Sequence, residues 1–229
     1  MNELQIKSGN EEVCLWCLSA LFTEKFLTES FDEVFKSYSN HQTASFKNIK
    51  KSDLIQTYRF GPALANVLAE EVYSEQFTGN ESYETEMFYI DARKIPGTKP
   101  HSSISECDAI LKYLKENQED DVGIITPYVN QRQELKNRFK GNKAMQDSIM
   151  TVHGSQGREW DAVIFSVADT TDMWFTNSLH PKSDGKKVIN TAVSRAKKKL
   201  IIVCDAEYWK PMEKQLIGKI LSVAEEIIL

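Results

Sequence analysis

The feature of this sequence that most constrains its fold is a regular alternation of short apolar runs with longer stretches of helical spacing. Strands buried on both faces read as continuous apolar runs, and such strands alternating with helices are typical of a mostly parallel sheet covered on both sides. We therefore predict an α/β fold. The predicted strands lie at 53–58, 87–91, 122–126, 148–153, 161–167 and 199–204, and the helices lie near 62–77, 103–118, 129–140, 187–198 and 207–228.

The pattern also predicts how the chain is divided. Apolar positions recur at helical spacing within 13–35, so we predict a helical N-terminal extension over residues 1–50 and one α/β domain over residues 51–229. Segment 168–187 is polar and contains Pro181, which predicts a surface insertion. Because ligands of parallel α/β sheets sit at the carboxyl ends of the strands, we expect the binding residues there.

Composition excludes several classes of protein. The 229 residues are 41% apolar and 27% charged, which is typical of a globular chain. No apolar run approaches the roughly 20 residues that cross a bilayer, and no basic-then-apolar signal pattern opens the chain. The 4 cysteines are too few for a disulfide framework. We therefore expect a cytoplasmic protein with no membrane partner.

Cys14 and Cys17 form a C-x-x-C pair, which could be a zinc half-site or a redox pair. The pair lies in an apolar run, and no second C-x-x-C or H-x-x-x-H completes a tetrahedral site. We therefore interpret these residues as buried thiols and expect no metal site.

Charge is distributed unevenly. The net charge of −5 argues against a wholly basic nucleic-acid coat protein. Segments 130–143 and 182–199 are nevertheless rich in lysine and arginine, with Glu134 and Asp184 as their only acidic residues. Such segments on an acidic body indicate a local surface for nucleic acid, although a solvated helix face is the alternative for 130–143.

The sequence lacks the elements with which a single domain binds a nucleoside triphosphate. No G-x-x-x-x-G-K-[ST] loop is present. Asp32 and Glu33 lie within a helical pattern, and Asp91 is not followed by Glu, so neither forms an acidic pair suited to magnesium. Since phosphate binding needs such a cradle, we predict that this chain alone does not hydrolyse a nucleotide.

Four segments remain that suit nucleotide and nucleic-acid chemistry. They read QTYRFGP at 56–62, GIITPY at 123–128 with Gln131 after it, TVHGSQGRE at 151–159 and NTAVSRAK at 190–197. In order and spacing they resemble the motifs of the second RecA-like domain of superfamily 1 helicases. The resemblance covers about residues 52–206 and is strongest to the branch that contains the nonsense-mediated-decay helicase and its DNA-helicase and helicase-nuclease relatives.

This resemblance implies a RecA-like, mostly parallel sheet flanked by helices, a P-loop NTPase fold without its own P-loop. It also implies the C-terminal motor lobe of an ATP-dependent helicase or translocase. ATP with Mg would be bound jointly with an N-terminal RecA-like lobe that this chain lacks. We accordingly expect the chain to be part of a longer protein.

The resemblance assigns catalysis to Arg59 and Arg195 as arginine fingers, because a guanidinium can stabilise charge on transferring phosphoryl oxygens through forked hydrogen bonds. Surface ion pairs are the alternative for both. Gly157 would allow backbone to approach phosphate, and Glu159 would accept a ribose hydroxyl. A simple turn, and an ion pair to Arg158 or Lys197, are the respective alternatives.

The resemblance assigns contacts with single-stranded DNA or RNA to Thr126, Tyr128, Thr151 and His153, which would bind successive phosphates along one rim of the sheet. His153 departs from the family pattern, which more often has an acidic residue there, so a buried strand-end histidine is the alternative.

Two other functions remain open. The chain could be a non-catalytic RecA-like module that binds nucleic acid or protein. A nuclease built on the same sheet is disfavoured, because the sequence has no clustered set of carboxylates.

Overall fold

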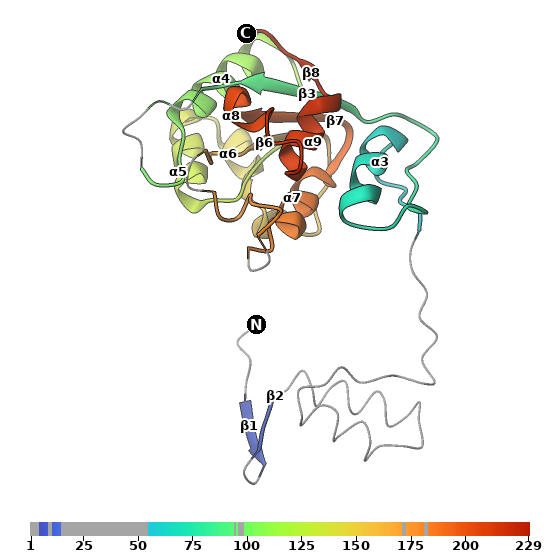
Figure 1. Ribbon diagram of the computed structural model, residues 1–229. Coiled ribbons are helices and arrows are strands. Elements are labelled where there is room, and N and C mark those ends of the chain that lie inside the picture. Colours follow the sequence, from blue (N-terminus) through green and yellow to red (C-terminus); the bar gives the residue numbers. More distant parts are fainter. Residues whose placement is uncertain are drawn as a thin grey trace. The chain divides into compact units, whose positions relative to one another are not determined.

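The structure is a computed structural model in which the chain forms two units, residues 1–53 and residues 54–229 (Figure 1). The residues that it describes are 5–8, 11–14, 55–93, 95, 99–170, 173–180 and 183–229.

In the first unit, β1 (Gln5–Ser8) pairs antiparallel with β2 (Glu11–Cys14). The predicted helix is therefore wrong for these residues. Only Gly9 and Asn10 separate the strands, and a Gly-Asn pair between two short runs favours a tight hairpin. The rest of the predicted extension, with Cys17, Asp32 and Glu33, lies outside the described residues.

The second unit contains a six-stranded, all-parallel sheet in the order β5-β4-β6-β7-β3-β8. The α/β prediction is confirmed. Its strands are β3 (Glu86–Asp91), β4 (Val122–Thr126), β5 (Ile149–Thr151), β6 (Trp160–Ser166), β7 (Ala196–Cys204) and β8 (Glu225–Glu226). Of the strand predicted at 53–58, the described residues 55–58 make a single isolated bridge, from Gln56 to Thr78.

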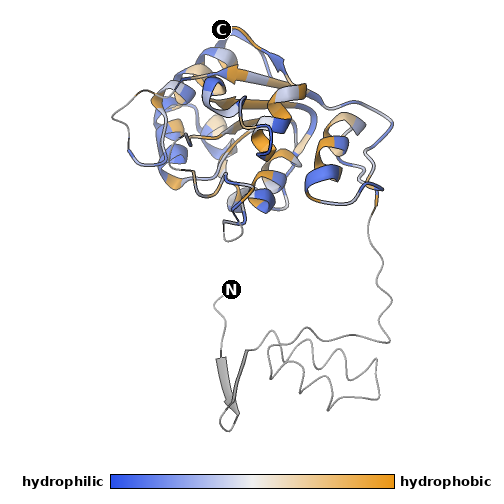
Figure 2. Cartoon of the chain, in the orientation of Figure 1, coloured by the Kyte–Doolittle hydropathy of each residue, from blue (hydrophilic) through white to orange (hydrophobic). Residues whose placement is uncertain are grey.

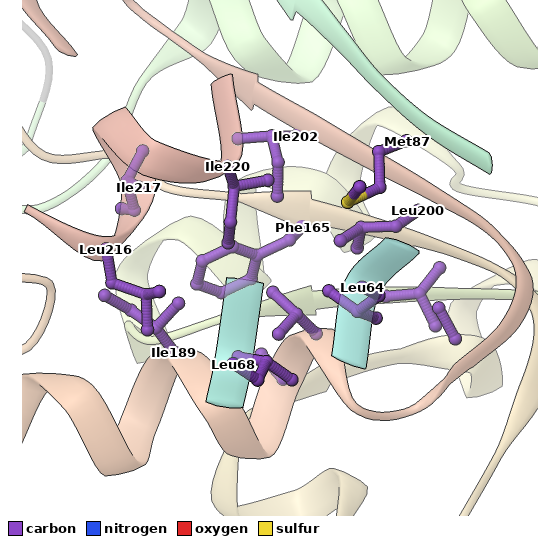
Figure 3. Packing of buried hydrophobic residues seen from close by; sticks show 14 of the residues in the cluster. Leu64, Leu68, Met87, Phe165, Ile189, Leu200, Ile202, Leu216, Ile217 and Ile220 are labelled. Carbon is purple, nitrogen blue, oxygen red and sulfur yellow. The ribbon is translucent and has the colours of Figure 1, made fainter. Parts of the chain in front are cut away.

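Helices cover both faces of this sheet because its central strands are apolar on both sides. Phe165 packs in one hydrophobic cluster and its neighbour Ile164 in the other, as the two-residue period of a strand requires. Helices α3 (Pro62–Glu71), α7 (Gly185–Val193), α8 (Ala206–Trp209) and α9 (Leu216–Val223) supply the first cluster, part of which Figure 3 shows. Helices α4 (Ile104–Glu116), α5 (Val129–Arg138) and α6 (Lys143–Ser148) supply the second.

Hydropathy follows the same division, with apolar strands inside and mixed helices outside (Figure 2).

Local sequence sets several helix ends. Pro62 occupies the first turn of α3, and the Ser103 hydroxyl accepts a hydrogen bond from the Glu106 amide at the start of α4.

Two predicted helices end early. The helix predicted at 207–228 is interrupted after α8, where Pro211 lacks an N–H group, and its last part forms α9 and β8. The helix predicted at 187–198 ends at Val193, because the residues from Ala196 onward pair with β6. Strand pairing thus overrides the helical spacing.

No helix among the residues that the structure describes is long and apolar enough to span a lipid bilayer.

Substitutions in the central strand β6 should lower the stability of the fold most. Phe165 on β6 is fully buried, so Phe165→Ala should lower the free energy of unfolding by about 3–5 kcal/mol through lost transfer energy and a cavity. Urea unfolding followed by circular dichroism measures this. Ile228→Ala, at a side chain that is 89% exposed, is the control and should change stability by less than about 0.5 kcal/mol. Equal effects would contradict the assigned core.

Candidate nucleotide and nucleic-acid sites

The structure brings the motif residues to two opposite edges of the sheet. Glu159 directly precedes β6 and Arg195 directly precedes β7, and the Trp160 amide donates to the Arg195 carbonyl at 3.1 Å. Since β6 and β7 are parallel, both residues lie at the amino edge. Thr126 and Thr151 are instead the last, mutually paired residues of β4 and β5, at the carboxyl edge. The expectation that all binding residues follow strands is therefore wrong for the predicted nucleotide residues.

At the amino edge, Arg59, Glu159 and Arg195 form what we call the arginine cluster. Arg59 Nε donates to Glu159 Oε1 at 2.6 Å, and Arg59 Nη1 donates to the Ser194 carbonyl at 3.4 Å. Arg195 Nε donates to the Thr191 carbonyl at 3.1 Å. Both arginines thus donate to carbonyl groups of the same short segment before β7, which contains Thr191 and Ser194.

The two guanidinium groups affect each other electrostatically. Burial lowers the pKa of Arg195, and the positive charge of Arg59 lowers it further, while Glu159 and Tyr73 act in the opposite direction. Arginine stays charged despite such a shift, so the site concentrates two permanent positive charges beside one carboxylate. Because the Arg59 side chain is 34% exposed, its charge is accessible to an anion from solvent.

Gly157 lies in an exposed turn with φ +81°, a left-handed conformation that favours glycine. A Cβ atom there would meet nothing within 4 Å, so the space above the backbone is open. Glu159 is 36% exposed and lies 4.0 Å from Lys197 Nζ. The ion pair to Lys197 that the sequence suggested is thus present but long, and Glu159 forms a shorter one with Arg59 at 2.6 Å.

The donor set of this cluster suits the terminal phosphate oxygens of ATP, which two guanidinium groups and an open glycine turn can approach. Within the described part of the chain, no group of three or more His, Cys, Asp or Glu side chains could hold a metal ion. The arginine cluster therefore presents cationic donors that suit an anion such as a phosphate group.

At the carboxyl edge, the predicted nucleic-acid residues differ in accessibility. Thr126 is fully buried and Tyr128 is nearly so. The Tyr128 hydroxyl donates to Asp169 and accepts from the Phe175 amide at 3.2 Å. Burial and the negative charge of Asp169 raise the pKa of Tyr128, so this phenol stays protonated. Neither Thr126 nor Tyr128 presents its side chain to solvent.

Thr151 and His153 are the accessible members of this group. Thr151 is partly buried, and its hydroxyl accepts from the Gly154 amide at 3.3 Å. His153 opens the short helix η1 (His153–Ser155) and is exposed. The alternative of a buried strand-end histidine is therefore wrong.

Asp169 is a central residue of this edge that sequence reasoning missed. It is 1% exposed, and its carboxylate accepts from Tyr128 and, at 2.8 Å, from the Thr176 hydroxyl. The His101 ring nitrogen lies 3.1 Å from it, and the ring stacks on Tyr128. Trp209 Nε1 donates to the Asp169 carbonyl at 2.9 Å.

Asp169 and Thr176 belong to the segment predicted as a surface insertion, and that prediction is wrong for them. Their polar groups are buried because Tyr128 and Asp169 satisfy one another there. An acidic residue soon after a largely apolar strand was the available signal.

Gln131, which the motif pattern singled out, is structural in this chain. It is fully buried, its amide oxygen accepts from the Ser103 amide at 2.7 Å, and its amide nitrogen donates to the Ser166 hydroxyl at 2.8 Å. It therefore joins α5 to the start of α4 and the end of β6.

The basic segments differ in how their charge is compensated. In 182–199, ion pairs of 2.7–3.0 Å join four lysines to acidic partners. In 130–143, Arg138 and Lys143 are paired, whereas Arg132, Lys136 and Lys140 form no ion pair with any described residue. The four pairs are Lys186–Glu71, Lys187–Asp184, Lys198–Asp161 and Lys199–Glu119.

Solved structures to which this chain is similar include helicases, at low sequence identity. The C-terminal domain of a possible DNA helicase from Lactobacillus plantarum WCFS1 has a TM-score of 0.46 at 12% identity, over 74% of this chain and 98% of that one. The Arterivirus nonstructural protein 10 helicase in complex with DNA has a TM-score of 0.37 at 17% identity, over 79% of this chain and 31% of that one.

Comparisons of sequence are more informative. Residues 97–207 match the family model described as AAA domain. An uncharacterized ATP-dependent helicase of Methanocaldococcus jannaschii is 27% identical over 82% of this chain, and replicase polyprotein 1ab of Bat coronavirus 512/2005 is 28% identical over 67% of it. The chain spans 27% and 2% of these two proteins. The chain is therefore similar to the AAA domain over residues 97–207 and to part of an ATP-dependent helicase, in agreement with the motif resemblance.

Proposed function

We propose that the chain is the C-terminal motor lobe of an ATP-dependent helicase or translocase of the branch that the motifs resemble. ATP with Mg would bind mainly to an N-terminal RecA-like lobe, and the arginine cluster would complete the site from the other side of a shared cleft. The observation that carries the proposal is that Arg59 and Arg195, far apart in sequence, converge on one segment at the amino edge.

The chemistry accounts for the residue types. Transfer of the γ-phosphoryl group to water develops negative charge on the phosphoryl and leaving oxygens, and preorganised cations stabilise that charge. Arg59 and Arg195 would each offer a planar fork of N–H donors to these oxygens, which a lysine could not.

The ion pair between Arg59 and Glu159 gives both residues a role before nucleotide binds. It holds the Arg59 guanidinium beside Glu159. When phosphate oxygens replace the carboxylate as the partner of Arg59, Glu159 would be left to accept a ribose hydroxyl. Gly157 would let backbone approach the phosphates, since its turn is open.

Single-stranded DNA or RNA would run along the carboxyl edge. Thr151 and His153 would contact the phosphate backbone there, because Thr151 is only partly buried and His153 is exposed. Thr126 and Tyr128 would support this surface from beneath, through the buried contacts of Tyr128 with Asp169. Arg132, Lys136 and Lys140, whose charges lack ion-pair partners in the described residues, would add electrostatic attraction.

The competing function is a non-catalytic binding module in which the arginines are structural. Adding the separately expressed N-terminal lobe and measuring ATPase with DNA or RNA discriminates between the two. We expect turnover only in the mixture. Absence of turnover in every reconstituted complex would favour the binding module, and stoichiometric turnover by this chain alone would contradict the shared cleft.

The arginine cluster leads to a kinetic prediction. In the protein that contains both lobes, Arg195→Ala should lower kcat about 10³-fold or more while nucleotide affinity falls much less, because the guanidinium acts on transition-state charge. Steady-state ATPase and nucleotide titration measure the two effects. Arg93→Ala, at an exposed arginine paired with Glu207 beyond β3, is the control and should have no effect. Equal losses of kcat and affinity would indicate a merely structural Arg195.

The carboxyl edge leads to a binding prediction. Thr151→Val and His153→Ala should each weaken binding of single-stranded oligonucleotides by about 10-fold, the effect of losing one hydrogen bond to a charged group. Fluorescence anisotropy with DNA and RNA homopolymers measures this. Lys112→Ala, which removes an exposed charge on α4, is the control. If the control weakens binding as much, general electrostatic attraction and not this edge binds the strand.

A further inference from the structure

The backbone segments that carry the two arginines meet at one hydroxyl group. Thr85 directly precedes β3 and is 1% exposed. Its Oγ1 accepts a hydrogen bond from the Gly61 amide at 2.8 Å and donates one to the Lys197 carbonyl at 2.5 Å. Gly61 follows Arg59 by two residues, and Lys197 follows Arg195 by two residues. A single oxygen atom therefore joins the two segments.

The Lys197 carbonyl lies at an irregularity of the sheet. Trp160 pairs with Ala196 and Ala162 pairs with Lys199, so the register between β6 and β7 shifts just after Arg195. A β-bulge of this kind leaves a residue outside the regular ladder and changes the direction of nearby side chains. Thr85 supplies a hydrogen-bond partner to the bulge and thereby fixes the strand start that carries Arg195.

The loop that precedes β3 also holds the segment that contains Arg59. The Tyr83 hydroxyl donates to the Arg59 carbonyl, and Asn80 Nδ2 donates to the Tyr58 carbonyl at 2.9 Å. A Cβ atom at Gly61 would lie 2.6 Å from the Thr85 amide nitrogen, so the two backbones are in direct contact. The segment of Arg59 therefore cannot shift without moving Thr85.

We infer that Thr85 is a positioning residue that fixes the separation of the Arg59 and Arg195 guanidinium groups. It touches neither guanidinium and acts through the backbone of both segments. Its relevance to catalysis rests on the proposed function, in which both arginines must reach the same phosphoryl group. Misplacement of a reacting group by about 1 Å can lower a rate by about 10²-fold, so a fixed separation matters.

The first test does not depend on ATPase activity. Thr85→Val keeps the shape of the side chain and removes both hydrogen bonds, and Thr85→Ser restores the hydroxyl. In this chain, nuclear magnetic resonance should show the Nε–Hε signals of both Arg59 and Arg195 shifted in Thr85→Val and close to the original in Thr85→Ser. Thr78→Val is the matched control, because the Thr78 hydroxyl is exposed and lies 3.4 Å from the Ile55 carbonyl. Unchanged signals in Thr85→Val, or a shift of only one arginine, would overturn the inference.

Amide exchange in the unmodified chain gives a second test, which holds even if Thr85→Val fails to fold. The Gly61 amide donates to Thr85 and should exchange slowly with solvent, although it precedes the first residue of α3. If the Gly61 amide exchanges as fast as the amide of Glu81, an exposed residue, the inference is overturned.

The third test uses the protein that contains both lobes. Thr85→Val should lower kcat by about 10- to 100-fold with little change in KM, and Thr85→Ser should recover most of the loss. Normal kcat in Thr85→Val, beside an inactive Arg195→Ala, would overturn the inference and leave the proposed function standing. Shifted arginine signals together with a fully active Arg195→Ala would instead refute the proposed function and leave the positioning of the arginines supported.

Discussion

The parallel pairing of β6 with β7 is the constraint on which the candidate nucleotide site depends. Parallel strands place the residues that precede them at the same edge, so Glu159 and Arg195 become neighbours although a long stretch of chain separates them. Pairing of β3 with β7 then brings Thr85 to the same edge, and the loop before β3 carries the Arg59 segment with it. The closeness of Glu159, Arg195 and Thr85 thus follows from this register.

The same strands separate the two candidate sites. The arginine cluster lies at their amino edge, and Thr151 and His153 lie at the carboxyl edge of the neighbouring strands. The nine residues of β7 span about 30 Å between the two edges. Because apolar clusters pack both faces of the sheet, the strands form a stiff connection, and a shift imposed at one edge would move the other with it.

Sequence predicted the parts of this molecule that depend on local pattern. Strand β4 was predicted with its observed bounds because VGIIT at 122–126 is a short β-rich run, and the structure buries all of it. The end of α8 before Pro211 and the antiparallel pairing of β1 with β2 show where helical spacing misled. The motifs pointed to Arg59 and Arg195. They could not reveal that Tyr128 is buried and contacts Asp169, because that arrangement depends on how distant segments pack together.

The lysines before and within β7 bear on how strongly salt would affect the proposed binding of nucleic acid. Affinity falls with salt in proportion to the number of phosphates that free cations neutralise, because each such contact releases condensed counterions. Four of these lysines already have carboxylate partners, so bringing them near a strand would release few ions. If the lobe binds a strand as proposed, these four lysines would therefore add less to the salt dependence of binding than Arg132, Lys136 and Lys140, which form no ion pair with any described residue.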